Sequence, residues 1–121
     1  MASNVDYALA RKATLRDLRR GLVDRSDLCD AHPELLRAAR HIGVRSTTSC
    51  PICKLGGLAH VRYAYGDRLR HANGRAIMGD NELERLGARH EEFTLYVVEV
   101  CASCGWNFLV TSYLLGKRHA G

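Results

Sequence analysis

Four of the five cysteines in this 121-residue sequence form two Cys-x-x-Cys pairs, Cys50 with Cys53 and Cys101 with Cys104. A two-residue gap lets the chain turn tightly enough for both sulfurs of a pair to reach one ion about 2.3 Å away. Two such pairs are the usual ligand set of a structural zinc site. We therefore expect these four cysteines to hold one structural zinc ion (Zn2+), with the 47 residues between the pairs folding back on themselves.

Three other chemistries use the same residue type and stay open as alternatives. Four thiolates also bind iron–sulfur clusters, although two symmetric pairs favour tetrahedral zinc. A redox dithiol of the thioredoxin kind sits in a βαβ context, which this sequence does not indicate. Two disulfides would suit an exported protein, yet we recognise no export signal at the start of the sequence.

The fifth cysteine, Cys29, stands alone and far upstream of both pairs. We interpret it as a small buried residue between two helices. The alternative is the resolving thiol of a redox sensor, in which oxidation of the zinc-binding thiolates releases the metal. The exposure of its side chain discriminates between these two interpretations.

The motifs of this sequence do not indicate an enzyme. Four cysteines fill all four coordination positions of a zinc ion, whereas a catalytic zinc keeps one position for water or substrate. None of the six histidines forms a His-Glu-x-x-His motif, and His60 is at most an alternative ligand that would replace a cysteine. The sequence contains no glycine-rich phosphate loop and no nucleophile elbow. We expect no catalytic residues.

Strands must bring the two cysteine pairs together. Residues 93–100 and 106–115 read as a hairpin with Cys101 and Cys104 at its tip, and residues 58–65 read as a strand that leaves the first pair. Three antiparallel strands tied by one metal make a zinc ribbon. The sequence thus predicts a zinc-ribbon domain over residues 50–121.

The remaining segments surround this ribbon. An insertion at about 66–92 carries a hairpin turn at Asn73-Gly74 and a short helix with a capping box that begins at Asn81. Residues 1–49 read as a helical hairpin without strands, which ends in a polar hinge at residues 46–49. The expected fold class is α+β, with an N-terminal helical region of residues 1–49 followed by the ribbon.

Three stretches of the sequence also carry a resemblance. They are Cys-Asp-Ala-His-Pro-Glu-Leu-Leu-Arg-Ala-Ala-Arg (29–40), Cys-Pro-Ile-Cys (50–53) and Val-Glu-Val-Cys-Ala-Ser-Cys-Gly-Trp-Asn (98–107). With Tyr63 to Asp67, they make nearly the whole chain resemble a small actinobacterial zinc-ribbon family of unknown function. The resemblance implies the ribbon layout and an actinobacterial source, and it implies no activity.

Charge bears on the kind of partner. The chain has 18 Lys and Arg residues against 13 Asp and Glu residues, which gives a formal charge of +5 and a pI near 9.2. This excess permits an acidic partner but is small for tight binding to free DNA, so direct contact with nucleic acid stays open. We expect partner contacts at arginines of the first helix and of the ribbon with its insertion: Arg16, Arg19, Arg20, Arg62, Arg68, Arg70 and Arg75. The alternative for the helix arginines is an ordinary solvated face.

These observations predict a non-enzymatic zinc-binding adaptor that docks on a large nucleoprotein assembly, with the transcription machinery (RNA polymerase) as the first candidate partner. The alternatives are a ribosome- or RNA-associated zinc-ribbon protein and a thiol or zinc redox sensor. We expect no small-molecule substrate. No run of about 18 apolar residues is present, so we expect no membrane partner and a cytoplasmic location.

Overall fold

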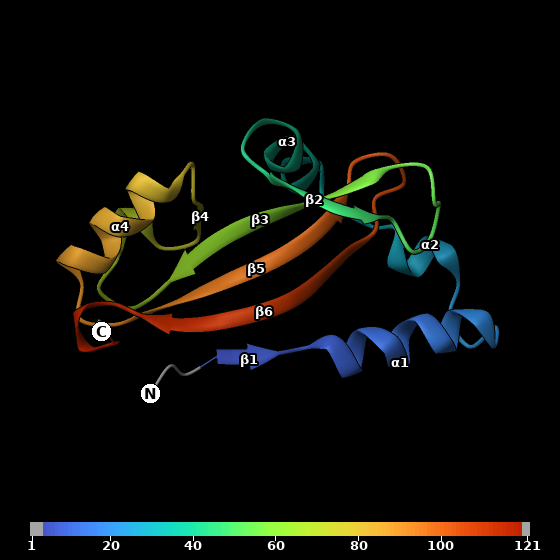
Figure 1. Ribbon diagram of the computed structural model, residues 1–121, viewed down its shortest axis with the longest axis horizontal. Helices are drawn as coiled ribbons and strands as arrows, with labels where there is room; N and C mark the ends of the chain where they lie inside the picture. The colour runs from blue at the N-terminus through green and yellow to red at the C-terminus, as the bar shows by residue number, and fades with distance from the viewer. Residues whose placement is uncertain (1–3, 120–121) are drawn as a thin grey trace.

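The computed structural model describes residues 4–119 and shows helices around one antiparallel sheet (Figure 1). The strands are β1 (Asn4–Asp6), β2 (Val44–Ser49), β3 (Gly57–Tyr65), β4 (Arg75–Ala76), β5 (Phe93–Cys101) and β6 (Asn107–Leu115). The helices are α1 (Ala8–Arg19), α2 (Arg25–Leu28), α3 (Pro33–His41) and α4 (Asp80–Arg89), with 3-10 turns at Arg70–Ala72 and Lys117–His119. Within this range the strand order is β1-β6-β5-β3-β2, and β4 pairs with β3.

The centre of the sheet consists of β3, β5 and β6, where the sequence predicts three strands. β5 and β6 pair antiparallel along their whole length, so the second cysteine pair lies at the tip of their hairpin. β3 pairs antiparallel with β5, and Leu58 lies directly opposite Cys101. The first cysteine pair, just before β3, therefore lies at the same end of the sheet as the second.

Helices α3 and α4 cover opposite faces of this sheet. Val61 and Val100 are fully buried and pack with Ala39 of α3. Ala64 and Leu95, which lie opposite each other in β3 and β5, pack with leucines of α4 instead. Because successive side chains of a strand point to opposite faces, the two helices lie on different sides of the sheet.

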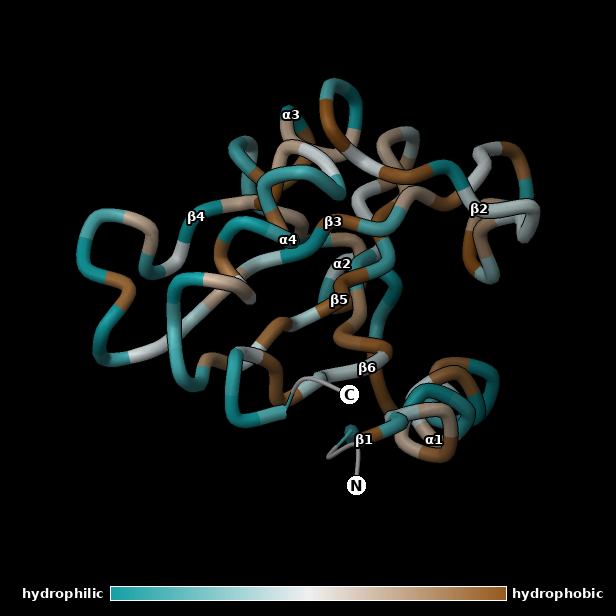
Figure 2. The backbone as a smooth tube through the Cα atoms, turned by 60° about the vertical axis from the view of Figure 1, so that its left-hand side comes forward, coloured by the Kyte–Doolittle hydropathy of each residue, from teal (hydrophilic) through white to brown (hydrophobic). Residues whose placement is uncertain are grey.

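The two ends of the sheet carry different structures. Figure 1 shows α4 at one end and α2 at the other, while β1 and α1 run along β6. Figure 2 shows hydrophobic stretches along β3 and β5, and alternating hydrophobic and hydrophilic turns in α1. This pattern fits a buried central sheet and a helix with one solvated side.

The N-terminal region differs from its prediction. It contains β1 and β2 in addition to helices, and residues 46–49, predicted to be a hinge, belong to β2. β2 is an edge strand and most of its residues are exposed, so it lacks the apolar alternation that would have revealed it. Both strands pair within the same sheet as the predicted ribbon strands. The division of the chain at residue 49 into two folding units stays a prediction.

The insertion also differs in detail. Asn73-Gly74 does form a turn, with Gly74 at φ +80°, but the segment before it is a 3-10 turn and β4 pairs with β3 rather than within a hairpin. The Gly74 N–H donates to the carbonyl of Ala64, which ties the turn to the sheet. Helix α4 begins two residues earlier than expected, and its N-cap Gly79 supplies no side chain, so the capping box at Asn81 is wrong.

No helix among residues 4–119 combines the length and the apolar character needed to cross a bilayer.

Candidate metal centre

The sulfurs of Cys50, Cys53, Cys101 and Cys104 all lie within 4.8 Å of one another. The Sγ atoms of Cys50 and Cys104 are 3.6 Å apart, and those of Cys53 and Cys101 are 3.7 Å apart. In a tetrahedral site with metal–sulfur distances of about 2.3 Å, neighbouring sulfurs lie about 3.8 Å apart. The cluster thus has the size of a four-thiolate metal site, and it could hold one metal ion.

The first pair lies in a tight turn between β2 and β3. The Cys50 N–H donates to the carbonyl of Gly56 at 2.8 Å, and the Ile52 N–H donates to the Cys50 sulfur at 3.3 Å. The backbone N–H groups of Leu55 and Gly56 donate to the Cys53 sulfur and lower the pKa of this thiol to about 6. The turn therefore stabilises a thiolate before any metal is considered.

The second pair lies in a similar turn between β5 and β6. The Gly105 N–H donates to the carbonyl of Cys101 at 2.9 Å, and the Cys101 N–H donates to the carbonyl of Trp106 at 2.8 Å. Gly105 has φ +91°, a left-handed conformation that glycine adopts without steric cost. A Cβ atom at this position would also lie 2.9 Å from the carbonyl oxygen of Cys29, so the close approach of another segment requires glycine a second time.

Burial disfavours the charged thiolate form of the cysteines in this cluster. Desolvation raises the pKa of Cys104 and of Cys50, against the effect of the backbone donors. Cys50 and Cys101 are completely buried, so water does not stabilise thiolates there. A cation among the four sulfurs would reverse this effect, because a metal-bound thiol is deprotonated. Four sulfur donors at tetrahedral spacing fit zinc and also fit iron.

Cys29 lies against this cluster, which sequence reasoning missed. Its Sγ donates to the Sγ of Cys104 at 3.5 Å, although 75 positions separate the two residues. Cys29 does lie between two helices, α2 and α3, but it is only partly buried. The Ala31 N–H donates to the carbonyl of Gly105 at 3.0 Å and holds this segment against the second turn. The odd number of cysteines was the only hint of a role for Cys29. Its position in the sequence does not indicate that it lies beside Cys104.

An aromatic wall supports the cluster from the sheet side. Trp106 is completely buried and packs with Cys50 and Cys101. Its indole N–H donates to the carboxylate of Glu99 at 2.6 Å, and Arg11 of α1 donates to the same oxygen at 2.8 Å. The buried carboxylate is thus paired, which a charge away from water requires.

The structure separates the predicted contact arginines into different places. Arg16 and Arg19 are exposed in the last turn of α1, and the exposed Arg20 follows them as the C-cap. Arg62 forms an ion pair with the exposed Asp80 at 2.8 Å. The remaining three line one cleft in the insertion: Arg68, Arg70 and Arg75.

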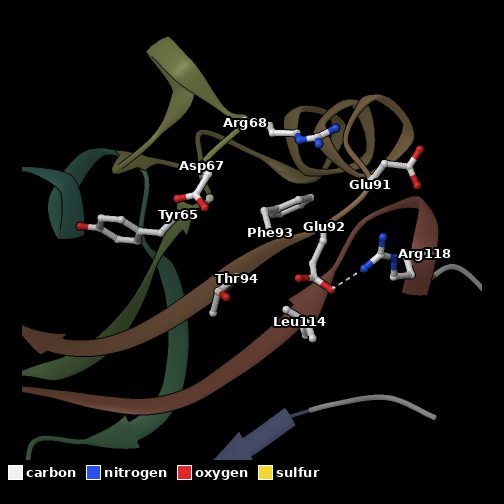
Figure 3. Close-up of a pocket in the computed structure, with 10 residues that line it drawn as sticks. Tyr65, Asp67, Arg68, Glu91, Glu92, Phe93, Thr94, Leu114 and Arg118 are labelled. Atoms are coloured by element: carbon white, nitrogen blue, oxygen red, sulfur yellow. Dashed lines mark ion pairs between the residues drawn. The ribbon is translucent and has the colours of Figure 1, made fainter.

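A cleft of about 360 Å³ lies at the sheet end opposite the cysteines (Figure 3). Its lining carries Arg68 and Arg118 together with Asp67, Glu91 and Glu92. Arg118 pairs with Glu92 across 3.8 Å, as the dashed line in Figure 3 marks. Because acidic and basic groups are mixed along this lining, the cleft does not select a ligand of one charge.

Comparison with known proteins shows to which family the chain belongs. The model of a family of unknown function, DUF5318, matches residues 2–121. The chain belongs to DUF5318. Two other proteins are similar to this DUF5318 chain: "Uncharacterized protein Rv0049" of Mycobacterium tuberculosis (strain ATCC 25618 / H37Rv) and "Uncharacterized protein Mb0050" of Mycobacterium bovis (strain ATCC BAA-935 / AF2122/97). Each is 43% identical over 112 residues, which cover 93% of the chain and 81% of the relative.

No solved structure matches the DUF5318 chain. Mycobacteria are actinobacteria, so the predicted membership in an actinobacterial family of unknown function is confirmed. The description of DUF5318 states no activity.

Proposed function

We propose that this DUF5318 chain is a non-enzymatic zinc-ribbon adaptor that docks on a large nucleoprotein assembly. RNA polymerase is the first candidate assembly, and the ribosome or another RNA-associated assembly is the alternative. The observation that carries the proposal is that four cysteine sulfurs lie within 4.8 Å of one another. They come from two tight turns, one for each pair, at the same end of the antiparallel sheet.

The donor set supports a structural role for the metal. All four tetrahedral positions would be filled by protein sulfurs, which leaves no position for a water or a substrate. Two of the four sulfurs belong to fully buried residues, and Trp106 closes the site from the sheet side. Such a closed site supplies folding energy rather than Lewis-acid catalysis.

The end of the first turn supports docking. Lys54 and Leu55 follow Cys53 directly, and Leu55 is 90% exposed. Lys54 has φ +63°, so the backbone of the turn is left-handed at this residue. An exposed leucine beside a cation, on a turn that a metal would make rigid, would give a protein partner one compact point of contact.

Affinity capture from the native cell tests this proposal, with and without nuclease. The matched variant is Lys54→Glu with Leu55→Asp, which changes the exposed turn and keeps all four cysteines. Polymerase subunits that persist after nuclease treatment and are lost with the variant support the first candidate. Ribosomal partners that nuclease removes support the alternative. Identical recovery with the native chain and the variant contradicts docking through this turn.

A second function, a thiol redox sensor, is favoured by the Sγ contact of 3.5 Å between Cys29 and Cys104. A hydroperoxide would oxidise Cys104 to a sulfenic acid, with the peroxide reduced to water or an alcohol. The Cys29 sulfur would then attack the sulfenic sulfur and release one water as the disulfide forms. The two cysteines lose two electrons in total, and the metal loses a ligand.

The redox function has its own test. The metal-loaded native chain and the variant Cys29→Ser are titrated with hydrogen peroxide while zinc release and intact mass are followed. The sensor predicts a disulfide between Cys29 and Cys104, and reversible zinc release only when Cys29 is present. Equal zinc release from both proteins, without that disulfide, contradicts the sensor.

A further inference from the structure

The insertion between β3 and β5 encloses a cleft of about 490 Å³ that is separate from the cysteine cluster. One wall is the 3-10 turn at Arg70–Ala72 with the residues around it, and the other wall is α4. Five arginines and a single acidic residue line this cleft: Arg68, Arg70, Arg75, Arg85, Arg89 and Glu82. The cleft is therefore strongly basic, in contrast to the mixed charges of the neighbouring cleft in Figure 3.

The five arginines lie on two walls of the cleft, and all five residues are exposed. Arg85 and Arg89 are four positions apart on α4, so they project from the same side of the helix. Between and beside the arginines, Leu69 is buried and Leu86 is partly buried in the apolar cluster under the cleft. The apolar residues under both walls thus fix the backbone that carries the arginines, whose own side chains reach solvent.

The five positive charges lack protein partners. Among residues 4–119, none of the five cleft arginines takes part in an ion pair or a side-chain hydrogen bond. Arg62, close in sequence, shows the contrast because it pairs with Asp80. Like charges around one concave space repel each other, and an anion inside it would relieve that repulsion.

We propose that this arginine cleft binds an anion that carries two or more phosphate groups close together. Guanidinium groups match phosphate oxygens bidentately, and five of them exceed what one phosphate can engage. The backbone of single-stranded RNA and the free nucleoside polyphosphates share this chemistry. The site goes beyond the adaptor function and is tested apart from it, because the variant at Lys54 and Leu55 changes the cysteine end of the sheet whereas the arginine variants change the insertion.

The experiment measures binding to the purified, zinc-loaded full chain at low and at moderate salt. The probes are a fluorescent single-stranded RNA ten-mer, ATP, inorganic tripolyphosphate and a polyglutamate peptide. The test variant is Arg85→Gln with Arg89→Gln, and the control is Arg25→Gln with Arg45→Gln, which removes the same charge from exposed positions outside the cleft. Circular dichroism and zinc content show that both variants remain folded.

The expected loss is about tenfold in affinity per cleft arginine, because each makes charge-assisted hydrogen bonds to phosphate. The control variant changes affinity by about twofold or less, since long-range charge is screened by salt. For the RNA probe, loss of two phosphate contacts also reduces the salt slope by about 1.4. The variant Arg70→Gln with Arg75→Gln changes the opposite wall, and we expect the same loss of affinity from it. It replaces the α4 variant in the experiment if that variant does not fold.

The probes distinguish the two sources of phosphate. Micromolar binding of RNA with weak binding of ATP and tripolyphosphate assigns the cleft to an RNA backbone. Micromolar binding of the small polyphosphates assigns it to a free nucleotide-like anion. The proposal is overturned if no phosphate probe distinguishes the cleft variants from the control variant at Arg25 and Arg45, or if only polyglutamate binds.

Discussion

Arg11 and Glu99 form an ion pair across 2.8 Å, although 88 positions separate them in the sequence. Arg11 lies on α1 and Glu99 lies on β5, two residues before the second cysteine pair. The same carboxylate oxygen accepts the indole N–H of Trp106, the tryptophan that packs on the cysteines. Helix α1, outside the predicted ribbon, is thus fastened to the wall of the candidate metal centre.

This ion pair can be tested by removing its cation. We expect Arg11→Ala to lower the free energy of unfolding by about 3 kcal/mol, because it leaves the nearly buried Glu99 carboxylate without a counter-charge. Urea denaturation measures the change. The control Lys12→Ala shortens the side chain of the next residue, which is exposed. It should change the free energy of unfolding by less than about 0.5 kcal/mol. Equal effects of the two substitutions would show that the pair contributes little.

The metal ligands and Cys29 should differ in their effect on metal content. We expect Cys50→Ser and Cys101→Ser to lose the bound zinc and to unfold the cysteine end of the sheet, because zinc binding is part of the folding free energy. Cys29→Ser should keep one zinc per chain. Elemental analysis with circular dichroism measures both quantities. Full zinc retention by Cys101→Ser would contradict the four-cysteine site, and zinc loss by Cys29→Ser would make Cys29 a ligand.

Gly105 and Gly21 form a matched pair for testing the second turn. Both have positive φ, +91° and +74° respectively, but a Cβ at Gly105 would meet the Cys29 carbonyl oxygen at 2.9 Å, whereas nothing lies within 4 Å at Gly21. We expect Gly21→Ala to cost about 1 kcal/mol through backbone strain alone. Gly105→Ala should cost at least about 2 kcal/mol more and should weaken zinc binding. Equal costs in thermal or urea unfolding would exclude the close approach of the Cys29 segment.

The single tryptophan gives a direct readout of metal removal. Trp106 is completely buried in the apolar cluster that contains the cysteines. We expect a strong zinc chelator to shift its fluorescence emission to longer wavelength and to lower the thermal midpoint, since the end of the sheet opens when the thiolates lose their cation. Added zinc should restore both signals. An unchanged emission spectrum after complete zinc removal would mean that the fold does not depend on the metal.

The central strands were predictable because their signals are local. Residues 93–115 alternate or run apolar on both sides of a Cys-x-x-Cys turn, and pairing of such a hairpin needs no information from elsewhere in the chain. The left-handed residue Gly105 follows from the same local geometry. β2 was missed because Val44–Ser49 lies at an edge with mostly exposed side chains, so burial imposes no pattern on it.

The sequence by itself indicated a four-cysteine metal site, because a gap of two residues lets both sulfurs of a pair reach one metal ion. Only the tertiary structure decided the rest of the chemistry. It placed Cys29 against Cys104, bound Arg11 to Glu99 and gathered five insertion arginines around one cleft. Each of these contacts depends on packing between segments that are far apart in the sequence. Such packing leaves no local pattern of spacing or hydrophobicity from which the partner of a residue could be predicted.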